Sequence, residues 1–342
     1  MSEQRIQAPQ RRQGVEILRL VAACGVVLIH FWPRALSSPH PTIDALVIGT
    51  SRFAVPFFFT ASAYFLRHRL DSLADGWRFA SKWIRILLLW HGIHAIWFTI
   101  LYLARTPDPF HHTPPWLMHL ASWDALFEGV AWPLWYLHSL VLCALLTSAI
   151  PPRWRIPLLL PAGMALYAMA LLWEPWRQVA PTWMPHTPLF INPRGFLFTA
   201  LLPFSLGLNA SRVPNANFAR GMILVGLLIQ TTEILHLAPA RQGQPHEFFL
   251  GSVILGASLF WSGLHWNPRW AGEIAWGAAS LPMYLIQLIG FSILFRIFGW
   301  PLAQAFGTGW TSDVGAICLA LPVYAILCHF LASTKAWNRH LC

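Results

Sequence analysis

The sequence predicts an all-α integral membrane protein. Of its 342 residues, 56% are hydrophobic and only 11% are charged, whereas a soluble globular chain carries roughly a quarter charged residues. Its apolar stretches are long and continuous rather than short and alternating, which favours membrane helices over a β-barrel. One helical span takes about 20 apolar residues, so the hydrophobic content allows about nine or ten spans. The composition therefore excludes a soluble enzyme.

Proline, glycine and charged residues divide the chain into ten candidate spans. In order, they run approximately over residues 15–33, 43–66, 80–104, 134–150, 157–173, 195–211, 219–238, 247–264, 271–298 and 312–333. The first follows Arg5, Arg11 and Arg12 as a signal peptide would, but it contains Glu16 and Arg19 and lacks a small-x-small cleavage site. We therefore expect it to be retained as a span.

Basic residues predict the orientation of these spans. With the N-terminus inside, 15 of the 23 Lys and Arg residues fall on the cytoplasmic side and five on the outer side, and three lie within spans. An excess of basic residues is typical of cytoplasmic loops. The distribution predicts that both termini, residues 1–14 and 334–342, are cytoplasmic, and we expect the bacterial inner membrane as the location.

We expect residues 1–342 to form a single membrane domain with two longer outer loops. In the first, 105–133, apolar residues recur at helical spacing, which indicates either an interfacial helix or a lid over a site. The second, 174–194, is rich in proline. The five cysteines show no CxxC spacing, and no nucleic-acid-binding module is visible, so we expect neither a metal site nor a nucleic-acid partner.

The first span carries the clearest candidates for chemistry. Arg19 and His30 are eleven residues apart, so they share one helix face about 16 Å apart along the axis. Arg19 suits an anionic ligand entering from the cytoplasm, and His30 suits a general base. Glu16, one turn before Arg19, is placed to hold its guanidinium. A lone histidine near the end of a span is also common as an interfacial residue, so spacing alone leaves both interpretations open.

The stretch EILRLVAACGVVLIH, with Arg-x10-His in a first span, resembles the acyltransferase-3 family of bacterial membrane acyltransferases. Further stretches resemble that family in the same order along nearly the whole chain. They are SRFAVPFFFTASAYFL (51–66), KWIRILLLW (82–90), PLWYLHSLVLCALLTSAIP (133–151), LLPFSLGLNASR (201–212) and SLPMYLIQLIGF (280–291).

The resemblance implies a ten-span O-acyltransferase, with acetyl-CoA as a cytoplasmic acyl donor. The implied acceptor is a hydroxyl of a cell-surface or exported polysaccharide or of its lipid-linked precursor, with polysaccharide synthesis or export machinery as a partner. Arg19 and His30 carry over as the essential pair. Arg19 would orient the donor or stabilise oxyanion charge, and His30 would activate the acceptor hydroxyl or relay the acyl group. Glu233 resembles an acidic position of the glycan-acetylating branch, which implies a role in proton handling or sugar binding, and Arg52 matches the basic residue of the RFAVP stretch.

Each remaining candidate has two interpretations. Arg52 is a candidate donor-binding residue or a structural partner of Glu16 or Asp44. Lys82 and Arg85 are topology signals or ligands for the CoA phosphates. His91 and His94, one turn apart, are read as packing or pore-lining residues because no third ligand supports a metal.

The aromatic start of the fourth span holds Trp135, Tyr136 and His138, which suit an interfacial belt or stacking on a sugar ring. Asn192 and Arg194 precede the sixth span and are candidate acceptor contacts. Gln287 departs from the family pattern, since the matching stretch often ends in histidine, and this weakens any mechanism that needs a second, C-terminal histidine.

The function predicted from the sequence is therefore membrane O-acetylation. The alternative is a transporter or exporter of a glycan or small amphiphile, because ten spans with few internal charges also suit a conduit. The sequence shows no inverted repeats or paired broken helices typical of transporters.

Overall fold

The computed structural model describes residues 12–32, 39–105, 132–181, 197–209, 214–237, 246–268, 275–334 and 337. Every regular element in these ranges is helical, which confirms the all-α prediction. The α-helices are α1 (Gln13–Phe31), α2 (Pro41–Ser51), α3 (Ala54–Leu66), α4 (Leu73–Arg105), α7 (Trp135–Ala149), α8 (Pro152–Trp173), α9 (Leu197–Leu208), α10 (Ala216–Leu237), α11 (Leu250–His265), α12 (Ser280–Phe306) and α13 (Trp310–Ser333). Three short 3₁₀ turns accompany them, η2 (Trp132–Leu134), η3 (Arg177–Val179) and η7 (Trp276–Ala279).

Seven helical segments in the described part of the chain are long and apolar enough to cross a membrane. They are α1, α2 with α3, α4, α8, α10, η7 with α12, and α13, while α7, α9 and α11 are shorter apolar helices. Large apolar side chains on α4, α10 and α12 are exposed, for example Leu88, Leu228 and Trp300. Such surfaces suit lipid rather than water, and the chain is a multi-pass membrane protein.

Each predicted span overlaps a described helix, but four spans differ from the structure. The second span is broken at Arg52 and Phe53 into α2 and α3. The third begins at Leu73 rather than residue 80, which makes α4 33 residues long, or about 50 Å. The fifth begins at Pro152 rather than at residue 157. The ninth begins with the η7 turn and continues to Phe306.

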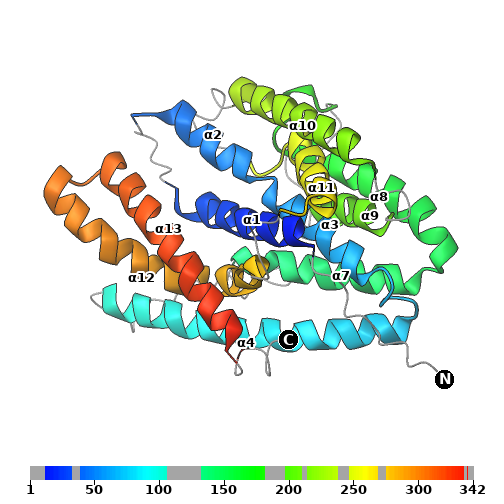
Figure 1. Ribbon diagram of the computed structural model, residues 1–342, viewed down its shortest axis with the longest axis horizontal. Helices are drawn as coiled ribbons and strands as arrows, with labels where there is room; N and C mark the ends of the chain where they lie inside the picture. The colour runs from blue at the N-terminus through cyan, green and yellow to red at the C-terminus, as the bar shows by residue number, and fades with distance from the viewer. Residues whose placement is uncertain are drawn as a thin grey trace.

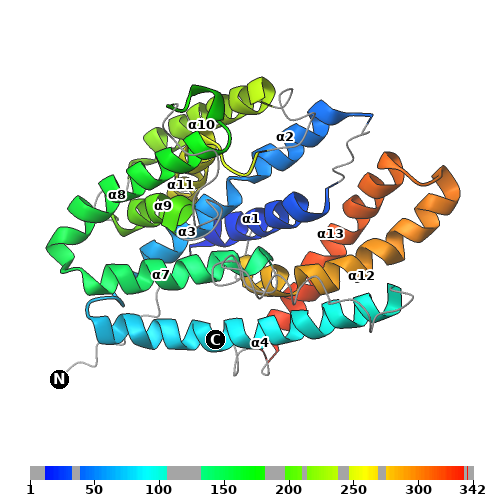
Figure 2. The ribbon, with the colours of Figure 1, turned by 180° about the vertical axis from the view of Figure 1, so that it is seen from behind.

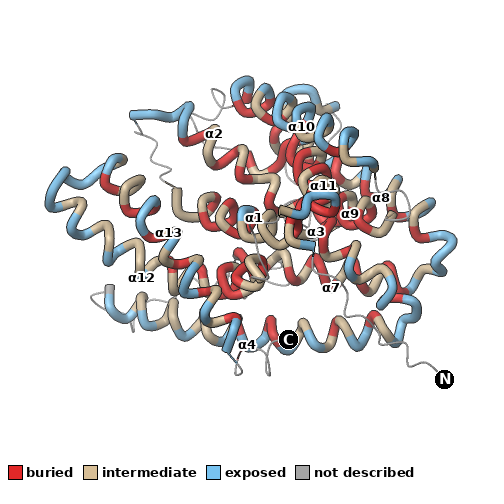
Figure 3. The backbone as a smooth tube through the Cα atoms, in the orientation of Figure 1, coloured by how far each residue is buried: buried red, intermediate tan, exposed pale blue. Residues whose placement is uncertain are grey.

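Helix α1 lies in the middle of the molecule (Figures 1 and 2). Helices α2, α10 and α11 lie on one side of it, α4 and α7 lie on the other, and α12 pairs with α13 at one end. Buried residues gather along α3, α9 and α11, whereas α4 and α10 expose their outer faces (Figure 3). The central position of α1 brings its polar residues into contact with several helices.

Small residues allow the helices around α11 to approach closely, as is common in membrane bundles. A Cβ atom on Gly256 would lie 2.6 Å from the carbonyl oxygen of Phe53 and 2.7 Å from the backbone nitrogen of Phe57. A Cβ atom on Gly251 would lie 2.4 Å from the backbone nitrogen of Gln230. The contacts of α11 with α3 and α10 therefore require glycine.

One end of α1 is fixed by a buried carboxylate. Asp44 of α2 is only 3% exposed, and its Oδ1 accepts hydrogen bonds from the indole N–H groups of Trp32 (2.7 Å) and Trp310 (2.8 Å). Trp32 is the residue after α1, and Trp310 begins α13. A buried carboxylate is tolerated only when it is well hydrogen-bonded, so this contact ties α1, α2 and α13 together.

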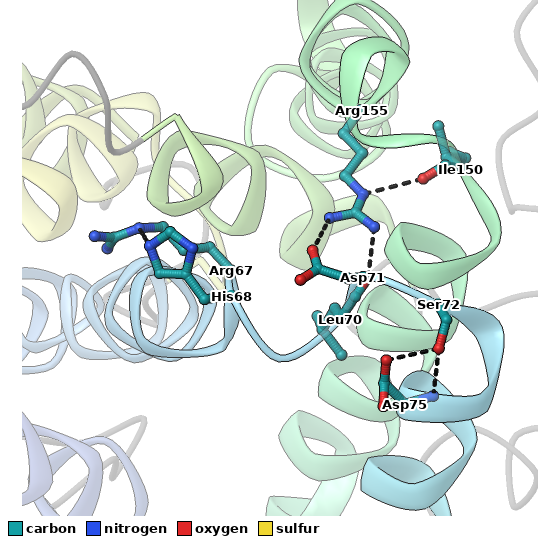
Figure 4. A network of polar contacts seen from close by, with 8 residues as sticks. All are labelled: Arg67, His68, Leu70, Asp71, Ser72, Asp75, Ile150 and Arg155. Atoms are coloured by element: carbon teal, nitrogen blue, oxygen red, sulfur yellow. Dashed lines mark hydrogen bonds and ion pairs between the residues drawn. The ribbon is translucent and has the colours of Figure 1, made fainter.

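A second polar junction joins the α3–α4 turn to the α7–α8 turn (Figure 4). The buried guanidinium of Arg155 donates to the carbonyl oxygens of Ile150 and Leu70 and lies 3.7 Å from Asp71. Ser72 donates to the Asp75 carboxylate in the first turn of α4 (2.6 Å). Arg155, one of the basic residues counted as a topology signal, therefore also holds two turns together.

The close contact between α11 and α3 yields a stability prediction. Gly256→Ala should lower the free energy of unfolding by about 1–3 kcal/mol, because the added methyl group meets backbone atoms that cannot rotate away. Gly92→Ala is the control, since a Cβ atom at Gly92 meets nothing within 4 Å and alanine favours helix. Thermal unfolding in detergent measures both. Equal melting temperatures for the two variants would contradict the packing described here.

Candidate active site

Arg19 on α1 is held by groups from two segments. Its Nη1 lies 3.2 Å from Oε1 of Glu16, and its Nη2 donates to Oγ of Ser280 at 3.2 Å. The Ser280 hydroxyl in turn donates to the carbonyl oxygen of Gly277 (2.7 Å). The first turn of α1 and the start of α12 therefore share one polar cluster around the guanidinium.

The same cluster fixes the Glu16 carboxylate. Its Oε2 accepts a hydrogen bond from the backbone N–H of Gly277 in the η7 turn at 3.1 Å. The guanidinium and the carboxylate therefore neutralise each other inside the bundle, and both have further hydrogen-bond partners there. The Arg19 side chain nevertheless keeps 34% of its surface accessible, so its guanidinium can still meet a ligand.

Tyrosines from α7 and α12 lie beside this cluster. The Tyr136 hydroxyl lies 3.0 Å from the Ser62 hydroxyl of α3 and is close enough to Arg19 for an electrostatic interaction. The rings of Tyr136 and Tyr284 pack edge to face with centroids 5.6 Å apart, and the Tyr284 hydroxyl donates to the carbonyl oxygen of Pro133. Tyr136 of α7 therefore joins the polar groups that α1 and α12 supply around Arg19, and it connects them to Ser62 of α3.

His30 lies in the last turn of α1 and is partly buried. The eleven-residue spacing puts it on the Arg19 face of one unbroken helix, about 16 Å further along the axis. Next to it, Phe31 packs on Phe291 of α12 with ring centroids 4.6 Å apart. Because Arg19 meets Ser280 and Phe31 meets Phe291, α1 and α12 run side by side along the whole stretch between the two candidate residues.

Arg52 has neither of the structural partners that the sequence suggested. Its Nη1 lies 2.7 Å from Oε2 of Glu247, whereas Glu16 and Asp44 bind the groups described above. The backbone N–H of Glu247 donates to both carboxylate oxygens of Glu174, and His246 Nδ1 lies 3.4 Å from the same carboxylate. The pairing with Glu16 or Asp44 was therefore wrong, because Glu247 approaches Arg52 from a segment far along the chain.

Glu233 is 4% exposed and faces the start of α11. Its carboxylate accepts hydrogen bonds from the backbone N–H groups of Leu250 (3.1 Å) and Gly251 (2.9 Å), which α11 leaves unpaired at its N-terminus. The Trp176 indole donates a third, at 3.1 Å. These contacts account for the buried carboxylate as a cap on the N-terminus of α11.

Other candidates lie apart from the Arg19 cluster. Lys82 and Arg85 are exposed on α4. Trp135 packs against Phe59. His138 Nε2 lies 3.4 Å from Nε2 of His91 on α4.

Asn192 and Arg194 lie outside the described residues, as do the ends of the chain and most of the two predicted outer loops. Among the residues that the structure describes, no group of three His, Cys, Asp or Glu side chains could hold a metal ion.

The sequence did not single out Ser62, Gly277, Ser280 or Tyr284. Three of them, Ser62, Ser280 and Tyr284, lie in stretches that carry the family resemblance, so those stretches contained the only signal. Polar residues in apolar segments are weak candidates until a partner is known.

Comparisons with known proteins identify the family of the chain. A family model described as an acyltransferase domain matches residues 12–329, nearly the whole chain. A serine/alanine racemase of Enterococcus gallinarum is 23% identical over 348 residues, covering 96% of this chain and 47% of that protein. An amino-acid racemase of Enterococcus faecalis is 26% identical over 280 residues, covering 76% of this chain and 38% of that protein.

The chain thus spans less than half the length of these two relatives. No solved structure matches it significantly.

The contacts of Glu233 yield a prediction. Glu233→Gln should lower the free energy of unfolding by about 1–3 kcal/mol, because the amide nitrogen then faces an N–H group that needs an acceptor. Trp176→Phe, which removes one of the three donors, should lower it less. Thermal unfolding of both variants measures this. A Glu233→Gln protein of unchanged stability that has lost activity would instead assign the carboxylate to the chemistry.

Proposed function

The chain belongs to the acyltransferase-3 family and is an acyltransferase, and from that premise we propose that it O-acetylates a glycan in the bacterial inner membrane. The donor is acetyl-CoA, and the acceptor is a hydroxyl of a cell-surface or exported polysaccharide or of its lipid-linked precursor. The observation that carries the proposal is the pair Arg19 and His30 on one face of the central helix α1, with Arg19 held in place by Glu16 and Ser280.

The proposed topology has ten crossings and two cytoplasmic termini. It counts the short helices α7, α9 and α11 together with the seven longer segments, and it places the excess of basic residues inside. In this orientation Arg19 lies in the cytoplasmic third of α1, and His30 lies near the outer surface.

The donor enters from the cytoplasm in this proposal. Lys82 and Arg85 are exposed on α4 where it leaves the apolar stretch, and there they can bind the CoA phosphates through charge-assisted hydrogen bonds. An extended pantetheine arm then covers most of the roughly 16 Å between the levels of Arg19 and His30. Because of this distance, Arg19 orients the donor. It does not donate a hydrogen bond to the oxyanion that forms beside His30.

His30 acts as the general base. It takes the proton of the acceptor hydroxyl while the hydroxyl oxygen attacks the thioester carbonyl carbon. The carbon–sulfur bond then breaks, and the proton passes to the departing thiolate, so the products are the acetyl ester and CoA. Arg52 and Glu233 have structural roles in this proposal. Arg52 forms an ion pair with Glu247, and Glu233 caps α11.

A glycan hydroxyl is the proposed acceptor, and an amino group is the competing one. The two relatives are named as racemases of amino acids, which brings an amino group into consideration as an acceptor. Purified protein in nanodiscs, given acetyl-CoA with either a glycan or free serine and alanine, separates the two. If the protein acetylates neither the glycan nor the amino acids but transports a glycan into vesicles, the transporter alternative is favoured.

Removal of the proposed base should abolish catalysis without loss of the fold. His30→Ala should lower kcat at least about 100-fold, in the range for general bases, and should leave membrane level and melting temperature nearly unchanged. Acetylated product is measured by mass spectrometry. A His30→Ala protein that acetylates at near wild-type rate would show that the assignment is wrong.

Loss of the exposed basic pair should weaken donor binding. Replacing Lys82 and Arg85 together with Gln should raise the KM for acetyl-CoA about tenfold and leave the KM for the acceptor within about twofold, because only the donor carries the phosphates. Arg153→Gln, at another exposed basic residue, is the control. In oriented vesicles, acetyl-CoA should bind from the cytoplasmic face, and binding only from the periplasmic face would contradict this arrangement.

A further inference from the structure

Helices α1 and α12 face each other between the levels of Arg19 and His30. At one end Arg19 donates to Ser280, and at the other Phe31 packs on Phe291. Between these contacts the interface is apolar, with Ala23 and Val27 of α1 in one buried cluster with Met283 and Phe291 of α12. A ligand held between these two helices would extend from the level of Arg19 to the level of His30.

One polar side chain interrupts the apolar stripe on α12. Gln287 lies seven residues after Ser280 and four before Phe291, so the three share one helix face. It stands about 10 Å beyond Ser280 along the helix axis. This places Gln287 between the level of Arg19 and the level of His30.

The amide of Gln287 is buried without a hydrogen bond. The residue is 0% exposed, and neither its Oε1 nor its Nε2 has a hydrogen-bond partner in the described part of the chain. Gln230 is equally buried and its Oε1 also has no partner, but its Nε2 donates to the carbonyl oxygen of Gly49 (2.6 Å) and lies 3.0 Å from Oγ of Ser252. Buried polar groups are nearly always paired, so an unpaired amide at this position requires an explanation.

Secondary amides offer both kinds of group that the Gln287 side chain lacks, an N–H that can donate to Oε1 and a carbonyl oxygen that can accept from Nε2. In a trans amide these two groups point in opposite directions, so both buried atoms gain a partner when the N–H comes from one amide and the carbonyl oxygen from another. A phosphate offers only acceptors, and an acyl chain offers neither donor nor acceptor. The pantetheine arm of CoA contains secondary amides between its phosphate and its sulfur.

We propose that Gln287 binds the secondary amides of the pantetheine arm, one N–H and one carbonyl oxygen, and holds the donor between α1 and α12, with its thioester toward His30. This inference rests on the proposed function, because it takes acetyl-CoA as the donor. Arg19 at one end and Gln287 in the middle then define the path of the arm. The histidine that often ends the family's matching stretch is replaced here by a donor-binding amide.

The test compares two buried glutamines in the full-length protein. Gln287→Leu should weaken acetyl-CoA binding about tenfold, because two hydrogen bonds to the arm are lost. The melting temperature of the ligand-free protein should be unchanged or higher, since an apolar side chain removes an unpaired polar group. Gln230→Leu is the matched control, and it should lower the melting temperature because the carbonyl oxygen of Gly49 loses its donor.

A second probe separates the arm from the nucleotide. Adenosine 3′,5′-bisphosphate carries phosphates but no pantetheine, so Gln287→Leu should bind it as the wild type does. Unchanged affinity of Gln287→Leu for acetyl-CoA, an equal loss for both probes, or a lower melting temperature would overturn the proposal.

An N-acetyl group on the acceptor is the other source of a secondary amide. Acceptors with and without that group distinguish the two, and a loss in Gln287→Leu that follows the acceptor's N-acetyl group would overturn the assignment to the donor. A wild-type protein that binds no acetyl-CoA would instead show that the proposed function itself fails.

Discussion

A guanidinium inside an apolar bundle has to be surrounded by groups that accept its hydrogen bonds, because a charge in hydrocarbon is costly. In this protein Arg19 imposes that requirement on the central helix. Glu16 meets it from the preceding turn, and Ser280 meets it from the start of α12. Gly277, which donates to Glu16, fixes the η7 turn against α1. The direction in which α12 leaves this turn then determines what faces α1 as far as His30.

The buried polar groups of the bundle are of two kinds. Asp44 and Glu233 bind donors from other helices, and Arg52 forms an ion pair with Glu247. Contacts of this kind give these residues partners within the fold. Arg19 is held but keeps part of its surface accessible, and Gln287 is buried without a partner. Residues that the fold does not fully satisfy are expected where a ligand binds, and both lie along the interface of α1 with α12.

Much of the fold could be predicted from the sequence, because helix formation and apolar length are local properties. The shared face of Arg19 and His30 is also local, since one helix carries both. Partners distant in sequence could not be predicted. Ser280 lies 261 residues from Arg19, and Trp310 lies 266 residues from Asp44. For the same reason, the two partners expected for Arg52 were wrong, and the cap that Glu233 forms on α11 was not expected. Which polar residues would remain unsatisfied depends on the packing of the complete bundle.

The account depends on the donor lying along α1, and a density map of the protein with a non-hydrolysable acetyl-CoA analogue tests this most directly. The map should show continuous density for the pantetheine arm between α1 and α12, in contact with Arg19 and Gln287, with the acetyl group toward His30. The nucleotide should lie at the end of the bundle that carries Lys82 and Arg85. Density for the analogue on the outer surface, or in a site that does not touch α1, would contradict the account.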